Sequence, residues 1–432
     1  MLKILKGYLL NKRTDNILFI GSVFVIFSSL FSSFFSYLFQ VLMGRALSVN
    51  DYGVLVALFS IFSIISLPYG FISPAITKIV SEIKDIDYPK GLSYFFYSVF
   101  RINFFIAFLL SFLPYLFRKY IADYLKISDI DLFVPFFLYL FSTLVFAINM
   151  AFLQALKRFK ALAVEYFSVS FAKFITAILA LYFSFSIGGT FGILALLTLF
   201  AGLIGYKLLL KNIVFSHRKF SKSNLNRIAT FSVASSFTFL GITFLFNNDV
   251  LLVKHLFDSQ TAGFYSSAAV IGRIIFYGVS PISMVLFPEC AERFFKKQDY
   301  LNPLIKGSAA VFFLSMLGFV IMYFFPTYVV KILFGDKYIN AVEFLPLYAL
   351  YMVSYTMVSV LGWLLVAISK LKEGALALGV AAIQYFSVKY YFNNSVSQVL
   401  WVSIILTSLL LMAYVGFIWR EYVDSKKVKN SL

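Results

Sequence analysis

The sequence predicts an all-α membrane protein of about twelve transmembrane helices, in two pseudo-symmetric six-helix lobes around a central cavity. Of its 432 residues, 61% are hydrophobic and only 13% are charged, whereas soluble domains are close to half apolar and about a quarter charged. The charged residues cluster, and the uncharged runs between clusters match the roughly 20 apolar residues that a helix needs to cross a bilayer. No other class of protein fits this composition.

Cutting the chain at its charged clusters places the helices in order. The run between Asp15 and Arg45 carries no charge. It exceeds the apolar region of a signal peptide and no A-x-A-like site closes it, so it is interpreted as a retained helix. The connections are short, which leaves no room for an extramembrane domain. The predicted helices cover residues 17–43, 53–77, 93–117, 132–154, 161–184, 188–209, 228–256, 262–288, 307–330, 344–369, 373–392 and 398–419.

The distribution of positive charge predicts the orientation. Most of the 37 Lys and Arg residues lie at the two termini or in loops on the same side as the termini, such as 78–92, 207–227 and 289–306. Cytoplasmic loops carry an excess of Lys and Arg, so both termini are expected in the cytoplasm. The formal net charge of +18 is then explained by basic loops that face anionic lipid head groups, and not by binding to nucleic acid.

An internal repeat suggests the two lobes. The segment LMGRALSVNDYGVLVAL (42–58) follows the first predicted helix, and LLVKHLFDSQTAGFYSSA (251–268) ends the seventh and opens the eighth. Each has a basic residue, then an outer turn, then a glycine at the start of the next helix. We therefore expect an N-terminal lobe over residues 1–209, a basic cytoplasmic linker over 210–227 and a C-terminal lobe over 228–432, as in transporters built from parallel repeats.

Five charged residues lie within predicted helices. Arg101, Lys173 and Arg273 are cations, whereas Asp249 and Glu165 are acids. A charged side chain at the bilayer centre costs roughly 2.5–3.5 kcal/mol on insertion scales, so such residues face the bundle interior or water. Because the cations outnumber the acids, the interior is expected to be net positive and suited to an anionic cargo such as phosphate or pyrophosphate. Each charge could instead belong to a structural ion pair or extend to an interface.

Other polar residues have less specific interpretations. Asn247 and Asn248 precede Asp249 and are candidates for interhelical hydrogen bonds or for the cavity lining. Arg45 and Lys254 lie at corresponding outer turns, where they are candidates for a gate. The single cysteine, Cys290, excludes an intrachain disulfide. The sequence contains neither a P-loop nor a Cys/His cluster of metal-binding spacing, so no metal and no cofactor is expected.

Four segments carry a resemblance to a known family. They are GRALSVNDYGVLVAL (44–58), FLQALKRFKALAVEY (152–166), NNDVLLVKHLFDSQTAGFYSSAAVI (247–271) and ILFGDKYINAVEFLPLYAL (332–350). The first looks like the R-x-L-x-x-x-D-Y-G signature of flippases for polysaccharide repeat units, of the O-antigen and capsule type. The others resemble, in turn, that family's inner loop between helices 4 and 5, its passage from helix 7 to helix 8 and its entry into helix 10. The chain departs from a strict repeat at Lys254, which stands where the first half has Arg45.

The resemblance implies a function that composition alone does not give. Such proteins belong to the multidrug/oligosaccharidyl-lipid/polysaccharide (MOP) exporter superfamily. They move undecaprenyl-pyrophosphate-linked oligosaccharides from the inner to the outer leaflet of the bacterial cytoplasmic (inner) membrane and are not enzymes. Membrane lipid, a polysaccharide polymerase and a chain-length regulator are the further partners to expect, with a proton or sodium ion for coupling. On this hypothesis the cations hold the head group, while Asp249 either neutralises a cation or titrates during transport.

Three other functions compete with this interpretation. A cation-coupled multidrug extruder of the same superfamily would need cavity carboxylates, whereas here interior cations outnumber interior acids. A membrane polysaccharide polymerase or ligase usually has a large outer loop, which the predicted topology lacks. A flippase for lipid-linked peptidoglycan precursors usually has two more helices.

Overall fold

The computed structural model describes residues 27–70, 72, 76, 79–80, 90–210, 222–296 and 298–430, and within them all regular structure is helical. The all-α prediction is therefore confirmed. The start of the first predicted helix, most of the predicted inner loop 78–92 and most of the predicted linker 210–227 lie outside the described residues.

Eleven helices in the described part of the chain are long and apolar enough to span a membrane. The eleventh predicted helix, 373–392, is divided into α15 (Leu371–Gly374) and α16 (Leu376–Tyr390). The 15 residues of α16 rise only about 22 Å at 1.5 Å per residue, less than the roughly 30 Å thickness of a bilayer core. A helix is thus present where the eleventh was predicted, but α16 alone is shorter than the bilayer core.

Three other predicted segments differ in detail from the observed helices. The predicted helix 307–330 ends earlier, as α12 (Leu301–Phe324), because Pro326 opens a separate helix, α13 (Pro326–Phe334). The predicted helix 262–288 is present as the span Ser259–Ser283, with an irregular turn at Arg273 between α10 (Ser259–Gly272) and α11 (Ile274–Phe295). The predicted outer loop after residue 117 contains a short helix, α5 (Arg118–Leu125).

The chain divides into two compact units. The first comprises Met1–Ala46, Pro68–Lys119 and Asp129–Ala229, and the second comprises Leu47–Leu67, Tyr120–Ser128 and Thr230–Leu432. Two segments from the first half of the sequence, α2 (Val49–Ser66) and most of α5, therefore cluster with the C-terminal helices. The division into lobes at residues 209 and 228 stays a prediction.

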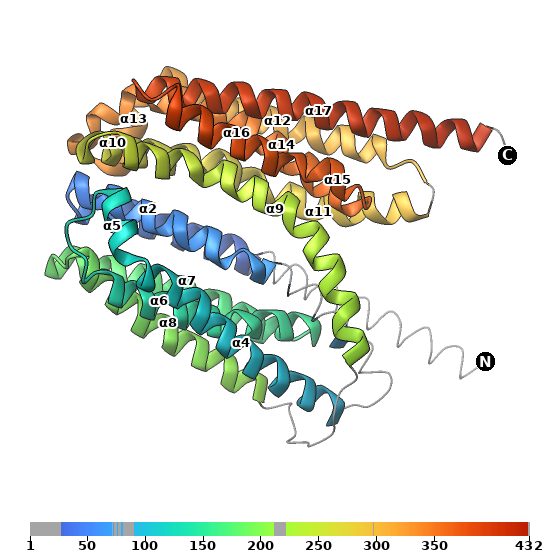
Figure 1. Cartoon of the computed structure of the whole chain (residues 1–432), viewed down its shortest axis with the longest axis horizontal. Helices are drawn as coiled ribbons and strands as arrows, with labels where there is room; N and C mark the ends of the chain where they lie inside the picture. The colour runs from blue at the N-terminus through green and yellow to red at the C-terminus, as the bar shows by residue number, and fades with distance from the viewer. Residues whose placement is uncertain are drawn as a thin grey trace. The chain divides into compact units, whose positions relative to one another are not determined.

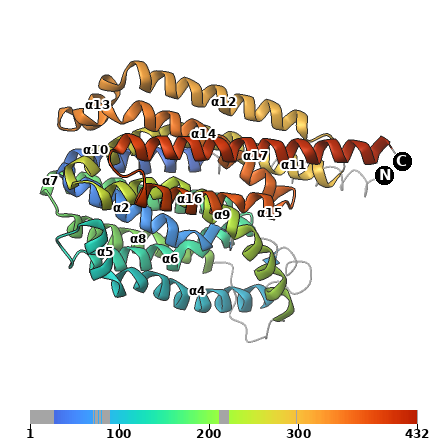
Figure 2. The same cartoon turned by 45° about the horizontal axis from the view of Figure 1, so that its top comes forward.

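The first unit is a helical bundle centred on α6. In it, α6 packs closely against α8 and α4, while α7 packs mainly against α8, and Figures 1 and 2 both show these helices running side by side. Two buried asparagines join them: Asn103 donates to Val145 O at 2.9 Å, and Asn149 donates to Gly202 O at 3.0 Å. The helices of this unit are the segment Phe27–Ala46, α4 (Lys90–Leu116), α6 (Phe133–Ala155), α7 (Phe159–Phe183) and α8 (Ile187–Leu210).

The second unit is built around α14 (Leu345–Ala367). Within the apolar window of this helix 83% of the residues are buried, against 17% for α12, so α14 is a core helix and α12 presents most of its surface to lipid. Helix α14 packs on α17 (Val396–Asn430), α12, α11 and α10, and Figure 1 shows α14 and α17 extending in parallel. The remaining elements are α9 (Lys222–Leu256, from Thr230 onwards) and the 3₁₀ helix η1 (Asp336–Glu343).

The two repeat segments form equivalent helix starts. Ser48 Oγ accepts from the Asp51 amide at 3.1 Å and so caps α2. Asp258 Oδ1 accepts from the Gln260 and Thr261 amides and caps α10. A side-chain oxygen in this position satisfies amides that the first helical turn leaves unpaired. The repeat found in the sequence therefore has a structural counterpart, and α2 and α10 pack against each other.

Candidate functional site

A buried acid and a buried arginine lie in one cluster of the second unit. Asp249, on α9, is fully buried, and Arg273, at the junction of α10 and α11, is 8% exposed. Tyr265 donates its hydroxyl to Asp249 Oδ2 at 2.7 Å. Arg273 Nε donates to the Tyr348 hydroxyl at 3.3 Å, and the charges of Arg273 and Asp249 interact. Tyr265 and Tyr348 thus lie between the two charged groups. Among the described contacts, Arg273 and Asp249 form no direct ion pair.

Close packing holds this cluster in place. The rings of Tyr265 and Tyr348 are 5.7 Å apart, edge to face, and those of Tyr348 and Tyr351 are 5.8 Å apart. Gly272 makes room for Tyr348, because a Cβ at Gly272 would lie 2.4 Å from Tyr348 Cδ1. The tyrosine that accepts from Arg273 is therefore fixed by the residue that precedes Arg273 in the chain.

Arg273 keeps donor capacity beyond its structural contacts. Its Nη2 donates to Phe246 O at 2.6 Å, and its guanidinium carbon lies 4.2 Å from the centre of the Phe246 ring. Arginine has five N–H donors in a planar fork, and two of them have acceptors within the described part of the chain. The remaining donors suit a bidentate contact with a phosphate. On the acid, Asp249 Oδ1 has no hydrogen-bond partner among the described atoms.

The two asparagines beside Asp249 connect helices. Asn247 donates to Thr243 O at 2.8 Å and to Ser63 Oγ of α2 at 3.4 Å. Asn248 donates to Ala381 O of α16 at 3.2 Å. Both are almost completely buried, where unpaired amides would cost free energy. Their contacts fit the interhelical role anticipated for them.

The two basic residues of the outer turns differ in their surroundings. Lys254 is 1% exposed, donates to Ser259 Oγ at 3.1 Å and interacts with the charges of Lys126, Asp51 and Asp258. Arg45 is exposed at the end of the helix Phe27–Ala46. Of these two basic side chains, Lys254 is therefore buried within its compact unit, whereas Arg45 is not.

The first unit contains the other predicted site residues, and it does not bring them together. Arg101 is exposed on α4 and Lys173 is half-buried on α7, and neither makes an ion pair or hydrogen bond to another described residue. Glu165 is 1% exposed. Its carboxylate fills the space beside Gly205, where a Cβ would lie 2.4 Å away. Arg101 and Lys173 belong to a different compact unit from Arg273, so a common cationic site stays a prediction.

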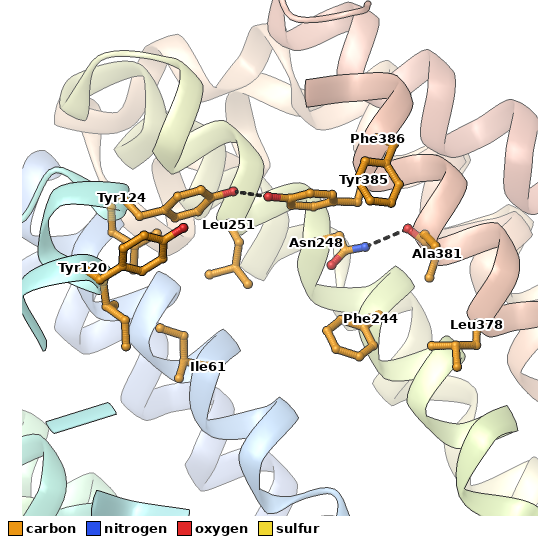
Figure 3. Close-up of a pocket in the computed structure, with 13 residues that line it drawn as sticks. Ile61, Tyr120, Tyr124, Phe244, Asn248, Leu251, Leu378, Ala381, Tyr385 and Phe386 are labelled. Atoms are coloured by element: carbon orange, nitrogen blue, oxygen red, sulfur yellow. Dashed lines mark hydrogen bonds between the residues drawn. The ribbon is translucent and has the colours of Figure 1, made fainter. Parts of the chain in front are cut away.

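A pocket of about 450 Å³ opens beside the Asp249 helix, within the second unit. Figure 3 shows its walls: Phe244, Asn248 and Leu251 come from α9, Tyr120 and Tyr124 from α5, and Ile61 from α2. The opposite wall is α16, with Leu378, Ala381, Tyr385 and Phe386. Three lining residues not labelled there are Ile121, Leu125 and Ala382.

The tyrosines are the functional candidates that sequence reasoning missed. Tyr348, Tyr351 and Tyr355 recur along α14 at a spacing that places them on one face of a helix. Tyr351 donates to the Leu245 carbonyl, and all three rings are buried. That spacing was visible in the sequence, but the abundance of aromatic residues, 55 Phe and 28 Tyr, concealed it. Among the described residues, no group of His, Cys, Asp and Glu is placed to hold a metal ion.

A multi-pass helical fold with long apolar spans defines a polytopic membrane protein, and comparison with known proteins identifies the family. The model of a family described as polysaccharide biosynthesis protein matches residues 42–343. The chain belongs to this family.

The chain is also similar to one known protein and to several solved structures. An uncharacterised membrane protein of Methanocaldococcus jannaschii is 25% identical over 356 residues, covering 78% of this chain and 83% of that protein. An inward-facing multidrug resistance MATE family transporter of the MOP superfamily matches with a TM-score of 0.73 at 11% identity, covering 93% of this chain and 96% of that one. The lipid II flippase MurJ, in an inward closed conformation, matches with a TM-score of 0.72 at 14% identity, covering 92% and 87%. The fold is therefore that of MOP transporters and flippases.

Proposed function

We propose that this protein is a flippase that moves polyprenyl-pyrophosphate-linked oligosaccharides from the inner to the outer leaflet by alternating access. The cargo is an undecaprenyl-linked repeat unit for O-antigen, capsule or exopolysaccharide, and the membrane is the bacterial cytoplasmic membrane, with both termini in the cytoplasm. A proton or sodium gradient drives the cycle, and a polymerase and a chain-length regulator act on the delivered product. The protein itself catalyses no covalent reaction.

The proposal rests on one observation: a buried arginine, Arg273, lies in a membrane protein of the polysaccharide biosynthesis family. Arg273 lies within the membrane span Ser259–Ser283 and has donors beyond those that its protein contacts use. A buried guanidinium with free donors is suited to the anionic pyrophosphate of a lipid-linked sugar. The cationic nitrogen of an organic cation, the cargo expected of a multidrug extruder, offers no acceptor to these donors.

The direct test is lipid translocation by the purified protein in vesicles. The substrate is a fluorescent polyprenyl-pyrophosphate oligosaccharide, and its exposure to an impermeant quencher measures transfer between leaflets. The native protein should accelerate that transfer. Arg273→Gln should slow it about 10- to 100-fold, the kinetic equivalent of losing one charge-assisted hydrogen bond.

Arg293→Gln is the matched control, because Arg293 lies on α11, the helix that begins directly after Arg273, in an exposed pair with Glu289 at 2.9 Å. It should transport normally. Equal rates for protein-containing and protein-free vesicles would refute the flippase proposal. Efflux of ethidium without movement of the lipid would instead support the multidrug extruder.

A further inference from the structure

The pocket beside α9 is closed at one end by direct contact between helices. A Cβ at Gly241 would lie 2.2 Å from the backbone nitrogen of Leu378, so α9 and α16 touch there. Farther along, Asn248 holds α9 to α16 through its bond to Ala381 O. The lining residues between these contacts and α5 enclose a space of about 450 Å³. Pockets of roughly 300–1,000 Å³ are typical of small-molecule sites.

The wall formed by α5 is held firmly to the end of α9. The rings of Tyr124 and His255 stack at 3.8 Å, almost parallel, and His255 Nδ1 lies 2.8 Å from Tyr124 O. Lys126 adds a hydrogen bond to Phe257 O at 2.8 Å. Three walls of the pocket, α5, α9 and α16, are therefore held together by direct contacts. Figure 3 shows Tyr124 on α5 reaching across to Tyr385 on α16.

The pocket offers few polar groups to a ligand. The amide nitrogen of Asn248 is already bonded to Ala381 O and Gln384 Oε1. The hydroxyls of Tyr124 and Tyr385 are 3.3 Å apart and bond to each other. Aliphatic and aromatic side chains form the rest of the lining. A sugar placed here would leave most of its hydroxyls without partners, which costs binding free energy, so the lining favours a hydrocarbon.

One cation lies at the tyrosine end of the pocket. Lys389 Nζ is 3.4 Å from the Tyr385 hydroxyl, and it lies over the rings of Tyr385 and Tyr390 at 5.5 and 5.7 Å. Its charge also interacts with the exposed Tyr120. Among the described residues Lys389 forms no ion pair with a carboxylate. An ammonium group of this kind can accept an anion from outside the chain.

We propose that this pocket binds the isoprenoid chain of an anionic polyprenyl phosphate lipid, with the phosphate beside Lys389 and Tyr120. The hydrocarbon lies against Phe244, Leu251 and Ala382, and the Tyr124–Tyr385 pair marks the boundary between the apolar chain and the head group. The choice of an isoprenoid over another anionic lipid rests on the proposed flippase function. The pocket thus gives this protein a second site for its lipid-linked cargo, in which the phosphate lies beside Lys389 instead of Arg273.

The test measures binding of tritiated geranylgeranyl pyrophosphate to the purified full-length protein in detergent. Ala382 lines the pocket and is exposed, so Ala382→Trp fills the space without displacing buried neighbours. This variant should bind at least about tenfold more weakly, whereas Ile383→Trp should bind as the native protein does. Ile383 is the matched control because it is the next residue on α16, is 53% exposed and lies outside the lining. Lys389→Gln should also weaken binding, and Lys389→Arg should restore it.

Two competitors identify the part of the ligand that is recognised. Inorganic pyrophosphate should not displace the probe, and phosphatidylglycerol should displace it poorly. Displacement by pyrophosphate would overturn the role of the chain, and equal displacement by phosphatidylglycerol would overturn the preference for an isoprenoid. Equal binding by the native protein, Ala382→Trp and Ile383→Trp would place the ligand elsewhere. That last result leaves the flippase proposal intact, since the translocation assay tests it separately.

Discussion

Gly53 and Gly263 pack backbone to backbone where α2 meets α10. A Cβ on Gly53 would lie 3.1 Å from the amide nitrogen of Gly263, and a Cβ on Gly263 would lie 2.1 Å from the carbonyl oxygen of Val49. Each glycine stands five residues after its helix cap, Ser48 or Asp258. The two repeats therefore use the same small residue at the same position, which allows the helices a closer approach than side chains would permit.

Gly263→Ala should destabilise the protein. The added methyl group meets backbone atoms, which cannot rotate away, so the helices must separate at a cost of about 1–3 kcal/mol. The measurement is thermal unfolding of the purified protein in detergent. Gly379→Ala is the control, because a Cβ at Gly379 meets nothing within 4 Å, and it should be neutral or slightly stabilising. Equal melting temperatures for both variants would contradict the close packing of α2 on α10.

The cap of α10 should make stability depend on pH in one direction. Hydrogen bonds from Thr261 hold the pKa of the Asp258 carboxyl below its ordinary value. In the unfolded chain the Asp258 carboxyl has its higher, ordinary pKa of about 3.9. The ionised cap therefore stabilises the folded protein above that pH, and this stabilisation is lost as the pH falls through the folded pKa. Asp258→Asn should therefore cost about 0.3–1 kcal/mol near neutral pH, and the difference from native should fade below about pH 4. A difference that stayed constant with pH would show that the charge of Asp258 plays no part.

Hydropathy predicted the fold class and most helices because a helix that crosses the hydrocarbon core must be a continuous apolar run of the sequence. Every spanning segment must be helical and apolar, so its length can be read directly from the sequence. Boundaries within the second unit were harder to predict, because packing among helices determines them. The irregular turn at Arg273 and the short α5 both contact distant segments of the chain, at Tyr348 and His255 respectively. Pro326 was a visible signal for the end of α12, since proline favours the first turn of a helix.

The candidate site was predicted in part for a similar reason. Composition identified Asp249 and Arg273 as interior charges, and the structure places both in one cluster. The sequence could not show that Tyr265 and Tyr348 connect them, because these residues come from different helices. The pocket on α9 was missed altogether, since its walls come from four separate segments of the chain.

Cysteine labelling should establish the orientation in the membrane. The single native thiol, Cys290, is completely buried, and a Cys290→Ser background removes it. Cysteines at Asp129 and Gln260, which are exposed, should react with an impermeant thiol reagent added outside intact cells. A cysteine at Gln298, also exposed, should react only after the cells are opened. The opposite pattern would place the termini outside.

Lys173→Ala should impair lipid translocation more than Arg101→Ala. Lys173 is half-buried near the middle of α7, whereas Arg101 is exposed on α4. Removal of a cation that contacts the head group costs about 1.5–3 kcal/mol, or roughly 10- to 100-fold in rate. Translocation rates in vesicles, compared at equal amounts of folded protein, measure the difference. Native rates in Lys173→Ala would remove this residue from the transport path.

Asp249→Asn should destabilise the protein, because it leaves the buried Arg273 without the charge that balances it. Breaking a buried ion pair costs about 3–5 kcal/mol, and the lower end is expected here because tyrosines separate the two groups. The double variant Asp249→Asn/Arg273→Gln removes both charges and should recover part of that loss in thermal unfolding. Glu289→Gln, which breaks the exposed pair with Arg293, should change stability by less than about 1 kcal/mol. If Asp249 instead carries the coupling ion, Asp249→Asn should have the melting temperature of the native protein and should lose only transport driven by an ion gradient. Measuring thermal stability and gradient-driven transport on the same preparation separates the two roles.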